Sequence, residues 1–297
     1  MSKKGKVMIG WIGLGNMGKP MSGRLLQADY SLVVYNRTKK KTKELAEKGA
    51  KVADSPAEVA SQADITFTMI ADSKALEDVT LNKDGVFEGA KPGSIFIDMS
   101  TVSPESSAKV GEAAKQKGIR YLRAPVSGST PAAAAGTLGI MVSGDEDAYS
   151  ESLEVLKVMG QKVFYLGSAE EARYMKLAVN IMIGTTCQIM SEALVFGEKA
   201  GLDWDKMLEV FTNSAVGSPL ISYKTKPILE RNFSPMFTVN LMAKDFDLAL
   251  AVGKDLTVPL PVASLVRQCL ATAKATGKGE LDFVSLVLLA EELAGIK

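Results

Sequence analysis

Residues 6–18, KVMIGWIGLGNMG, join an apolar segment to a turn that is rich in glycine. The apolar part, residues 6–12, predicts a buried strand, and Gly13, Gly15 and Gly18 form the pattern G-x-G-x-x-G. Glycines at these spacings permit a tight turn and let a pyrophosphate approach the N-terminus of the next helix. The order of strand, turn, helix and strand therefore predicts a dinucleotide site. The helix and the second strand are expected at residues 21–28 and 31–35.

The residues after the second strand distinguish NADP from NAD. NAD enzymes usually place Asp or Glu here to bind the ribose 2′-hydroxyl. This sequence has Asn36-Arg37-Thr38, followed by three lysines. Arg37 can form a forked, charge-assisted pair with a 2′-phosphate, which a carboxylate would repel, and Thr38 can donate its hydroxyl. We therefore predict NADP (NADPH) as the preferred cofactor, with NAD as the alternative.

Strand and helix patterns alternate as far as residue 166, which predicts an α/β fold with a Rossmann-type, doubly wound parallel sheet. Strands are expected at 64–70, 94–100, 119–127, 138–144 and 162–166, and helices at 56–62, 73–80, 104–117 and 145–158. Ligands of such sheets bind at the C-terminal ends of the strands. The predicted cofactor-binding residues of this region are Gly13, Leu14, Gly15, Asn16, Met17, Gly18, Asn36, Arg37, Thr38, Met69, Ile70 and Thr101.

From about residue 170 the strand patterns stop. Helices are expected at 170–199, 203–213, 218–230, 239–254, 260–275 and 281–294. We predict a dinucleotide-binding Rossmann domain at 1–168 and an all-α domain for substrate binding and oligomerisation at 169–297, built on its long first helix. Lys176 lies in that helix, directly before fifteen uncharged residues, and Asn180 follows it by one helical turn.

Composition excludes several classes of function. The chain has 35 basic and 34 acidic residues, so it lacks the charge excess of a nucleic-acid or anionic-membrane binder. It contains no histidine, which excludes imidazole catalysis and His-ligated zinc, and we predict no metal. Neither cysteine belongs to a C-x-x-C motif. The N-terminal residues are expected to lead directly into a strand and do not have the pattern of a signal peptide. The uncharged run after Lys176 is too short to span a bilayer. A cytoplasmic protein is expected.

Five motifs occur in the order found in β-hydroxyacid dehydrogenases, a family that includes 3-hydroxyisobutyrate dehydrogenases and glyoxylate/succinic semialdehyde reductases. They are GLGNMGKPM (13–21), IDMSTVSP (97–104), APVSGS (124–129), Lys176 with Asn180, and KDFDLAL (244–250). The resemblance covers essentially the whole chain. It implies reversible hydride transfer between a nicotinamide cofactor, here predicted to be NADP(H), and a small β-hydroxy acid or aldehyde acid. It also implies a homodimer or homotetramer joined through the helical domain.

The resemblance also implies roles for single residues. Lys176 and Asn180 correspond to the catalytic lysine and its asparagine, and Lys244 to a lysine at the nicotinamide end of the site. The substrate-binding residues would be Ser127, Gly128, Ser129, Lys176 and Asn180. The residues agree with this chemistry, because hydride addition makes an alkoxide that needs a proton. A lysine that is partly buried beside Lys244 and apolar residues loses its charge more readily, which makes Lys176 a workable general acid and base.

Arg123, Glu170 and Ala172 depart from the family pattern. The family usually has an acid at the position of Arg123 and glycines at the other two. The charges at 123 and 170 could reshape the substrate pocket or only form surface contacts. Two other functions stay open, namely a non-catalytic NADP-binding sensor or scaffold and an imine reductase on the same fold. The residue patterns leave the identity of the hydroxy acid or aldehyde acid open.

Overall fold

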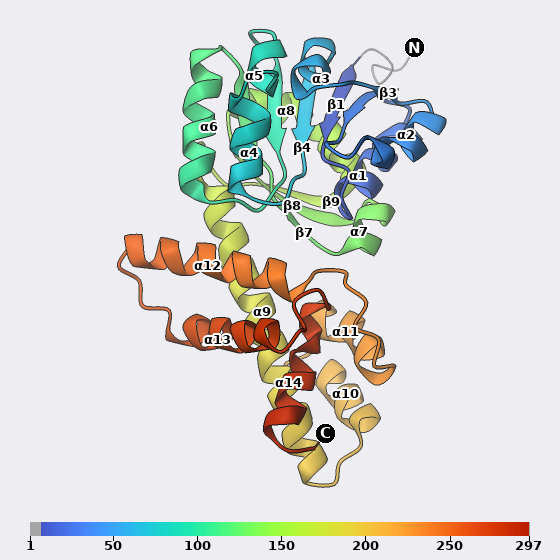
Figure 1. Ribbon diagram of the computed structural model, residues 1–297, viewed down its shortest axis with the longest axis vertical. Helices are drawn as coiled ribbons and strands as arrows, with labels where there is room; N and C mark the ends of the chain where they lie inside the picture. Colours follow the sequence, from blue (N-terminus) through green and yellow to red (C-terminus); the bar gives the residue numbers. More distant parts are fainter. Residues whose placement is uncertain (1–6, 297) are drawn as a thin grey trace. The chain divides into compact units, whose positions relative to one another are not determined.

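The computed structural model describes residues 7–296, and the chain divides into two compact units, one ending at Lys176 and the other beginning at Leu177. The boundary predicted between residues 168 and 169 lies just before helix α9 (Glu171–Lys199), which begins in the first unit and continues into the second. Figure 1 shows the two units as a sheet flanked by helices and as a group of helices.

The first unit contains a nine-stranded, mostly parallel sheet with the order β3-β2-β1-β4-β5-β6-β8-β7, in which β9 pairs with β8. The strands are β1 Met8–Ile12, β2 Ser31–Tyr35, β3 Lys51–Val52, β4 Ile65–Thr68, β5 Ile95–Asp98, β6 Arg120–Arg123, β7 Val126–Ser127, β8 Leu138–Gly144 and β9 Gly160–Tyr165. The helices are α1 Gly18–Gln27, α2 Lys43–Glu47, α3 Pro56–Gln62, α4 Ser73–Leu81, α5 Val86–Gly89, α6 Pro104–Gln116, α7 Thr130–Ala135 and α8 Glu146–Met159, with a 3₁₀ turn, η2, at Lys39–Thr42. The doubly wound fold is thereby confirmed, and Lys6 of the first predicted strand lies outside the described residues.

Two expectations about the sheet were wrong. The single strand predicted at 119–127 is interrupted between β6 and β7, because Pro125 has no N–H to continue a ladder and restricts the backbone of Ala124. The sheet is also not parallel throughout, since β8 runs antiparallel to β6 and β7. Only residues 128–137 connect β7 to β8, and a parallel crossover needs about a dozen residues or more.

Strand β1 is buried on both faces, as expected for a central parallel strand. Ile9 and Trp11 belong to the apolar core on one side of the sheet and Ile12 to the core on the other. The indole of Trp11 stacks on Phe67 with 5.4 Å between ring centroids and donates a 3.0 Å hydrogen bond to the carbonyl of Gly13. Trp11 therefore connects the apolar core to the glycine turn through a hydrogen bond.

The second unit is all α, as predicted. Its helices after α9 are α10 Trp204–Asn213, α11 Pro219–Leu229, α12 Val239–Asp255, α13 Pro261–Ala275 and α14 Leu286–Leu293, the last preceded by a 3₁₀ turn, η3, at Phe283–Ser285. Cys187 and Leu194 of α9 pack in one core with Phe246 of α12. Burial raises the pKa of the Cys187 thiol to about 12.

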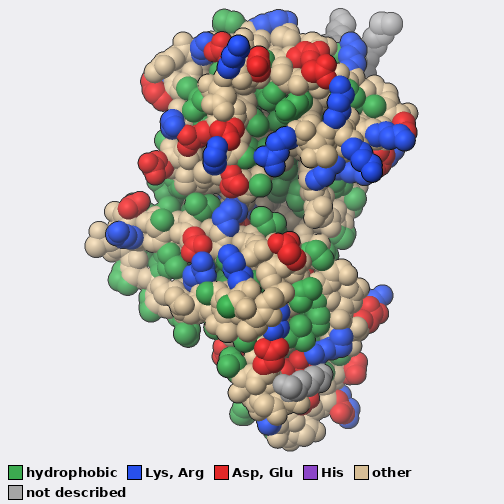
Figure 2. Space-filling view, viewed as in Figure 1, with side chains coloured by type: hydrophobic (Ala, Val, Ile, Leu, Met, Phe, Trp, Pro, Cys, Tyr) green, Lys and Arg blue, Asp and Glu red, His purple; other side chains and the backbone are tan. Residues whose placement is uncertain are grey.

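Helix α9 is long and apolar enough to cross a membrane by length and composition alone, with a mean hydropathy of 1.3 over its most apolar window. Of that window, 44% is buried inside the protein. Figure 2 shows acidic and basic side chains interspersed over the visible face.

Candidate active site

The glycine turn between β1 and α1 has the geometry of a pyrophosphate cradle. Gly13 has φ +98°, and a Cβ there would overlap the carbonyl oxygen of Met69, while a Cβ at Gly18 would overlap the carbonyl oxygen of Gly13. Gly15 differs, because a Cβ there would meet nothing within 4 Å. The outer two glycines therefore allow close packing, and the exposed Gly15 leaves open space in front of the turn. This division of roles fits a dinucleotide.

Asn36 holds the turn together rather than pointing outward. Its carbonyl accepts a 2.9 Å hydrogen bond from the N–H of buried Leu14, and its amide donates a 3.0 Å bond to the carbonyl of Thr38. The two segments predicted to bind the cofactor are thus joined through one side chain.

Arg37 and Thr38 are exposed beside this junction. The first lysine after them, Lys39, pairs with Asp54 at 2.6 Å. Arg37 makes no ion pair with any described residue. Its side chain is exposed, and its role in binding a 2′-phosphate stays a prediction.

The other predicted cofactor residues of this unit lie at the ends of β4 and β5. Met69 donates its N–H to the carbonyl of Ile12 at 2.9 Å, and Ile70 donates its N–H to the hydroxyl of Ser100 at 2.9 Å. Thr101 follows Ser100 and is partly buried. Asn16 is exposed and Met17 partly buried at the start of α1, where backbone N–H groups can face an anion.

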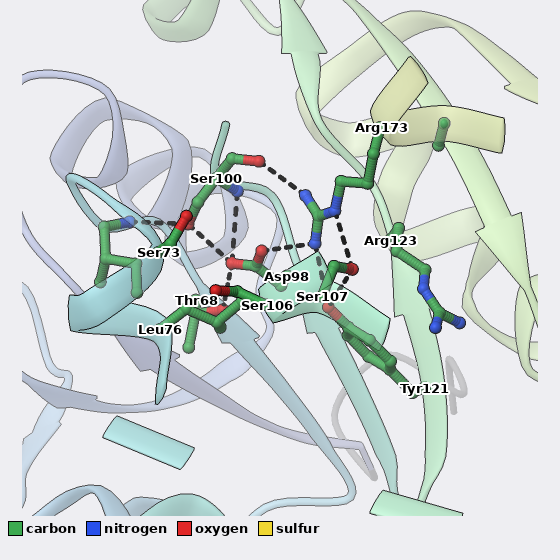
Figure 3. Close-up of polar contacts among 12 residues, drawn as sticks. Thr68, Ser73, Leu76, Asp98, Ser100, Ser106, Ser107, Tyr121, Arg123 and Arg173 are labelled. Carbon is green, nitrogen blue, oxygen red and sulfur yellow. Dashed lines mark hydrogen bonds and ion pairs between the residues drawn. The ribbon is translucent and has the colours of Figure 1, made fainter. Parts of the chain in front are cut away.

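A buried polar network that was not predicted from the sequence lies next to the loops after β4 and β5 (Figure 3). Asp98, at the end of β5, accepts hydrogen bonds of 2.6 Å from both Thr68 and Ser100, and Arg173 of α9 pairs with its other oxygen at 2.6 Å. Burial raises the pKa of Tyr121, so the hydroxyl that accepts a 2.9 Å bond from Arg173 stays protonated. The sequence contained one signal, since Arg173 precedes Lys176 by three residues in an apolar helix.

Arg123 and Glu170, which break the family pattern, form an ion pair with each other at 2.5 Å. The Arg123 guanidinium also stacks 4.3 Å above the ring of Tyr121, and a Cβ at Gly111 would crowd it. Ala172, the third departure, is buried, and its N–H donates to the hydroxyl of Ser143 at 3.1 Å.

The predicted substrate residues Ser127, Gly128 and Ser129 lie between β7 and α7. Ser127 pairs in register with Gly139 of β8, and Gly128 has φ +134°, a conformation that other residues rarely adopt. Ser127 and Ser129 are partly buried and Gly128 is exposed. Lys176, in the same unit, keeps only 9% of its surface exposed.

Asn180 and Lys244 belong to the second unit, where both contact Asp245. Asn180, which is 3% exposed, donates its amide hydrogen bond to one carboxylate oxygen, and the Lys244 ammonium lies 2.8 Å from the other. Asp245 is buried and was not among the predicted site residues, although it stands next to Lys244 in a quoted motif. The carboxylate sets which way the Asn180 amide faces.

A dinucleotide-binding sheet followed by a helical unit, with buried Lys176 and Asn180 one turn apart on the long helix α9, defines a class of NAD(P)-dependent oxidoreductases. Residues 8–167 match the family model of the NAD-binding domain of 6-phosphogluconate dehydrogenase. Residues 171–290 match the model described as NAD-binding of NADP-dependent 3-hydroxyisobutyrate dehydrogenase. The chain belongs to the β-hydroxyacid dehydrogenase family, and its activity is that of an NAD(P)-dependent hydroxyacid dehydrogenase or reductase.

Individual relatives agree with this assignment. The chain is 38% identical to glyoxylate/succinic semialdehyde reductase 1 of Arabidopsis thaliana over 94% of its own length and 96% of the relative's. A structure of Mycobacterium tuberculosis 3-hydroxyisobutyrate dehydrogenase with L-serine is similar at a TM-score of 0.86 and 29% identity, covering 95% of this chain and 98% of that one. A structure of Psf3 with NADP⁺ and 2-OPP gives a TM-score of 0.88 at 28% identity, with coverage of 95% and 99%.

Proposed function

We propose that this chain reduces a small aldehyde acid, of the glyoxylate or semialdehyde type, to the hydroxy acid with NADPH, and that Lys176 is its general acid and base. The observation that carries the proposal is Lys176 itself, a lysine that is 9% exposed and opens an uncharged stretch of α9. Similarity to a glyoxylate/succinic semialdehyde reductase supports the substrate class.

The bound nicotinamide would supply or accept the hydride. In the direction of reduction, the substrate carbonyl oxygen becomes an alkoxide, and the Lys176 ammonium donates the proton that makes it a hydroxyl. In the reverse direction the neutral amine takes that proton. Asn180, one turn later on α9, is assigned to orient the amine, because Asp245 accepts from its amide nitrogen and an amide oxygen can accept a hydrogen bond.

The substrate carboxylate is assigned to Ser127, Gly128 and Ser129. Gly128 takes a positive φ of +134° at the end of β7, and Ser127 and Ser129 stand on either side of it in the chain. Such a turn suits an anion. Lys244 is assigned to the nicotinamide end of the site, with Asp245 holding its ammonium.

NADPH is the proposed cofactor because Arg37 and Thr38 are exposed next to the glycine turn, with no carboxylate at the end of β2. The structure with NADP⁺ among the similar proteins supports this choice. We further propose a cytoplasmic homodimer or homotetramer joined through the helical unit, with no nucleic acid or membrane as partner. Exposed Met182, Ile189 and Phe196 of α9 support the self-association.

The test is a spectrophotometric panel of glyoxylate, succinic semialdehyde, methylmalonate semialdehyde and tartronate semialdehyde, each with NADPH and NADH. We expect oxidation of NADPH with at least one of them, and slower turnover of the matching aldehyde that lacks the carboxylate. Adding a cyclic imine tests the imine-reductase alternative. Tight NADPH binding without turnover of any of these compounds would instead support a sensor or scaffold.

A further inference from the structure

We propose that Arg173 is a positioning residue that locks the first turn of α9 onto the cofactor edge of the sheet and thereby sets the place of Lys176. The inference rests on the proposed function, because it assigns Lys176 the proton transfer. All the groups that carry it belong to the first unit.

The guanidinium of Arg173 contacts three different elements (Figure 3). It donates to the Asp98 carboxylate at the end of β5 at 2.6 Å, to the Tyr121 hydroxyl on β6 at 2.9 Å and to the Ser107 hydroxyl on α6 at 3.1 Å. A fourth bond of 2.7 Å reaches the backbone carbonyl of Ser100. Arg173 is 1% exposed, so these contacts replace its hydration.

The same network reaches the backbone that is predicted to bind the cofactor. The Ser100 hydroxyl donates to Asp98 and accepts from the N–H of Ile70, and the Ser100 carbonyl that Arg173 holds belongs to the peptide bond to Thr101. One side chain thus fixes the loops after β4 and β5 and the start of α9. Arg173 touches none of the reacting atoms and acts only through these neighbours.

Lys176 follows Arg173 by three residues, which on a helix places the two on adjacent turns of the same side, about 4.5 Å apart along the axis. A second anchor lies one residue earlier, where Ala172 donates its N–H to Ser143 of β8. With both anchors, α9 can neither rotate nor slide without breaking buried hydrogen bonds. A shift of about 1 Å at a catalytic group can cost on the order of 10²-fold in rate, so such a lock has a measurable effect.

A buried charge pair can also stabilise the fold without affecting catalysis. The variants are chosen to separate this role from the positioning of Lys176. Arg173→Gln removes the cation and leaves Asp98 buried and unpaired, which destabilises the fold. The double variant Asp98→Asn/Arg173→Gln removes both charges and should recover stability. Arg173→Lys keeps a charge but not the planar fork that reaches four acceptors. Arg120→Gln is the control, because Arg120 is also an arginine of this unit that forms an ion pair, at the start of β6 with Glu151 of α8, and within the described part of the chain it has no hydrogen bond to the Arg173 network.

The measurements are kcat, KM, the NADPH dissociation constant, the urea midpoint, and amide hydrogen exchange of residues 98–101 and 171–176 in the protein without substrate. We expect Arg173→Gln and the double variant to lose kcat by on the order of 10²-fold, and Arg173→Lys to lose less. NADPH affinity should fall by less than kcat, because the loops after β4 and β5 loosen while the predicted phosphate contacts at Gly13, Gly18 and Arg37 remain, and both peptides should exchange faster. Arg120→Gln should keep wild-type kcat and exchange in both peptides.

Wild-type kcat per folded enzyme in Arg173→Gln would overturn the inference, as would joint recovery of stability and kcat in the double variant. If Arg173→Gln does not fold, Arg173→Lys decides the matter by the same comparison. Turnover by the wild type tells the two proposals apart. If the wild type reduces an aldehyde acid and the Arg173 variants do so equally well, only this inference fails. If the wild type reduces none, the proposed function fails and this inference with it.

Discussion

Arg123 and Glu170 are the two charges that break the family pattern, and each is the partner of the other. Their side chains are only 11% and 12% exposed, so either one alone would be a poorly solvated charge. Arg123 also covers the ring of Tyr121, whose hydroxyl belongs to the network around Arg173. Both residues therefore fit a structural role beside this network. Because they form a nearly buried pair, they are not the surface contacts that the sequence offered as one alternative.

Arg37 is the residue proposed to determine the cofactor preference. Arg37→Ala should reduce the preference for NADPH over NADH by about 1.5–3 kcal/mol, the usual contribution of a charged hydrogen bond. Lys41→Ala is the matched control, because Lys41 is an exposed cation of the same loop outside the predicted site. The measurement is kcat/KM for both cofactors. Equal use of NADPH and NADH by the wild type would refute the assignment.

Lys176 carries the proposed chemistry. Lys176→Met should lower kcat by roughly 10²–10⁴, the range for a positioned acid–base group, with little change in NADPH affinity. Lys176→Arg should fail almost as badly, because guanidinium keeps its proton at any working pH. Lys199→Met, at the exposed end of the same helix, is the control. Single-turnover NADPH oxidation beside a fluorescence titration separates chemistry from binding, and a Lys176→Met variant with most of its rate would show the lysine to be structural.

The three glycines of the turn between β1 and α1 have different packing, so substitutions at each should have different effects. Gly13→Ala and Gly18→Ala should destabilise the first unit, since each added Cβ overlaps a carbonyl oxygen and Gly13 has positive φ. Gly15→Ala should leave the urea midpoint nearly unchanged, because its Cβ enters open space, yet weaken NADPH binding by occupying that space. The comparison needs urea unfolding and NADPH titration of all three variants. An unaltered NADPH affinity in Gly15→Ala would mean that the cofactor does not lie against this turn.

Local sequence patterns were enough to predict most helices and strands. They were insufficient where contacts between residues far apart in the sequence determine the structure. Strands at 31–35 and 138–144 and the helix at 56–62 have the predicted bounds, because each combines an apolar pattern with clear breakers. The direction of β8 depends instead on how short its connection is. Asp98 and Arg173 are 75 positions apart, so the apolar surroundings of Arg173 in its helix could not show that Asp98 is its partner. Asp245 could not be predicted from the sequence for the same reason, because its contact with Asn180 joins two different helices.

At the scale of the whole molecule, the chain leaves an apolar stripe uncovered on its longest helix. Met182, Ile189 and Phe196 are 69%, 58% and 78% exposed and recur every seven residues, which places them on one side of α9. Exposed apolar surface of this kind marks an interaction site. A second copy of the chain is the proposed occupant, because the same stripe on a two-fold related subunit is complementary to itself.

This self-association is testable by light scattering coupled to size-exclusion chromatography. The double variant Ile189→Asp/Phe196→Asp should shift the mass toward the monomer, since each buried apolar side chain contributes about 1.5–3 kcal/mol and an aspartate would bury a charge instead. The fold itself should survive, because both positions face outward in the single chain. Phe164→Asp, at a 49% exposed position on β9 of the first unit, should keep the wild-type mass. A monomeric wild type, or a double variant with unchanged mass, would place the stripe outside any subunit interface.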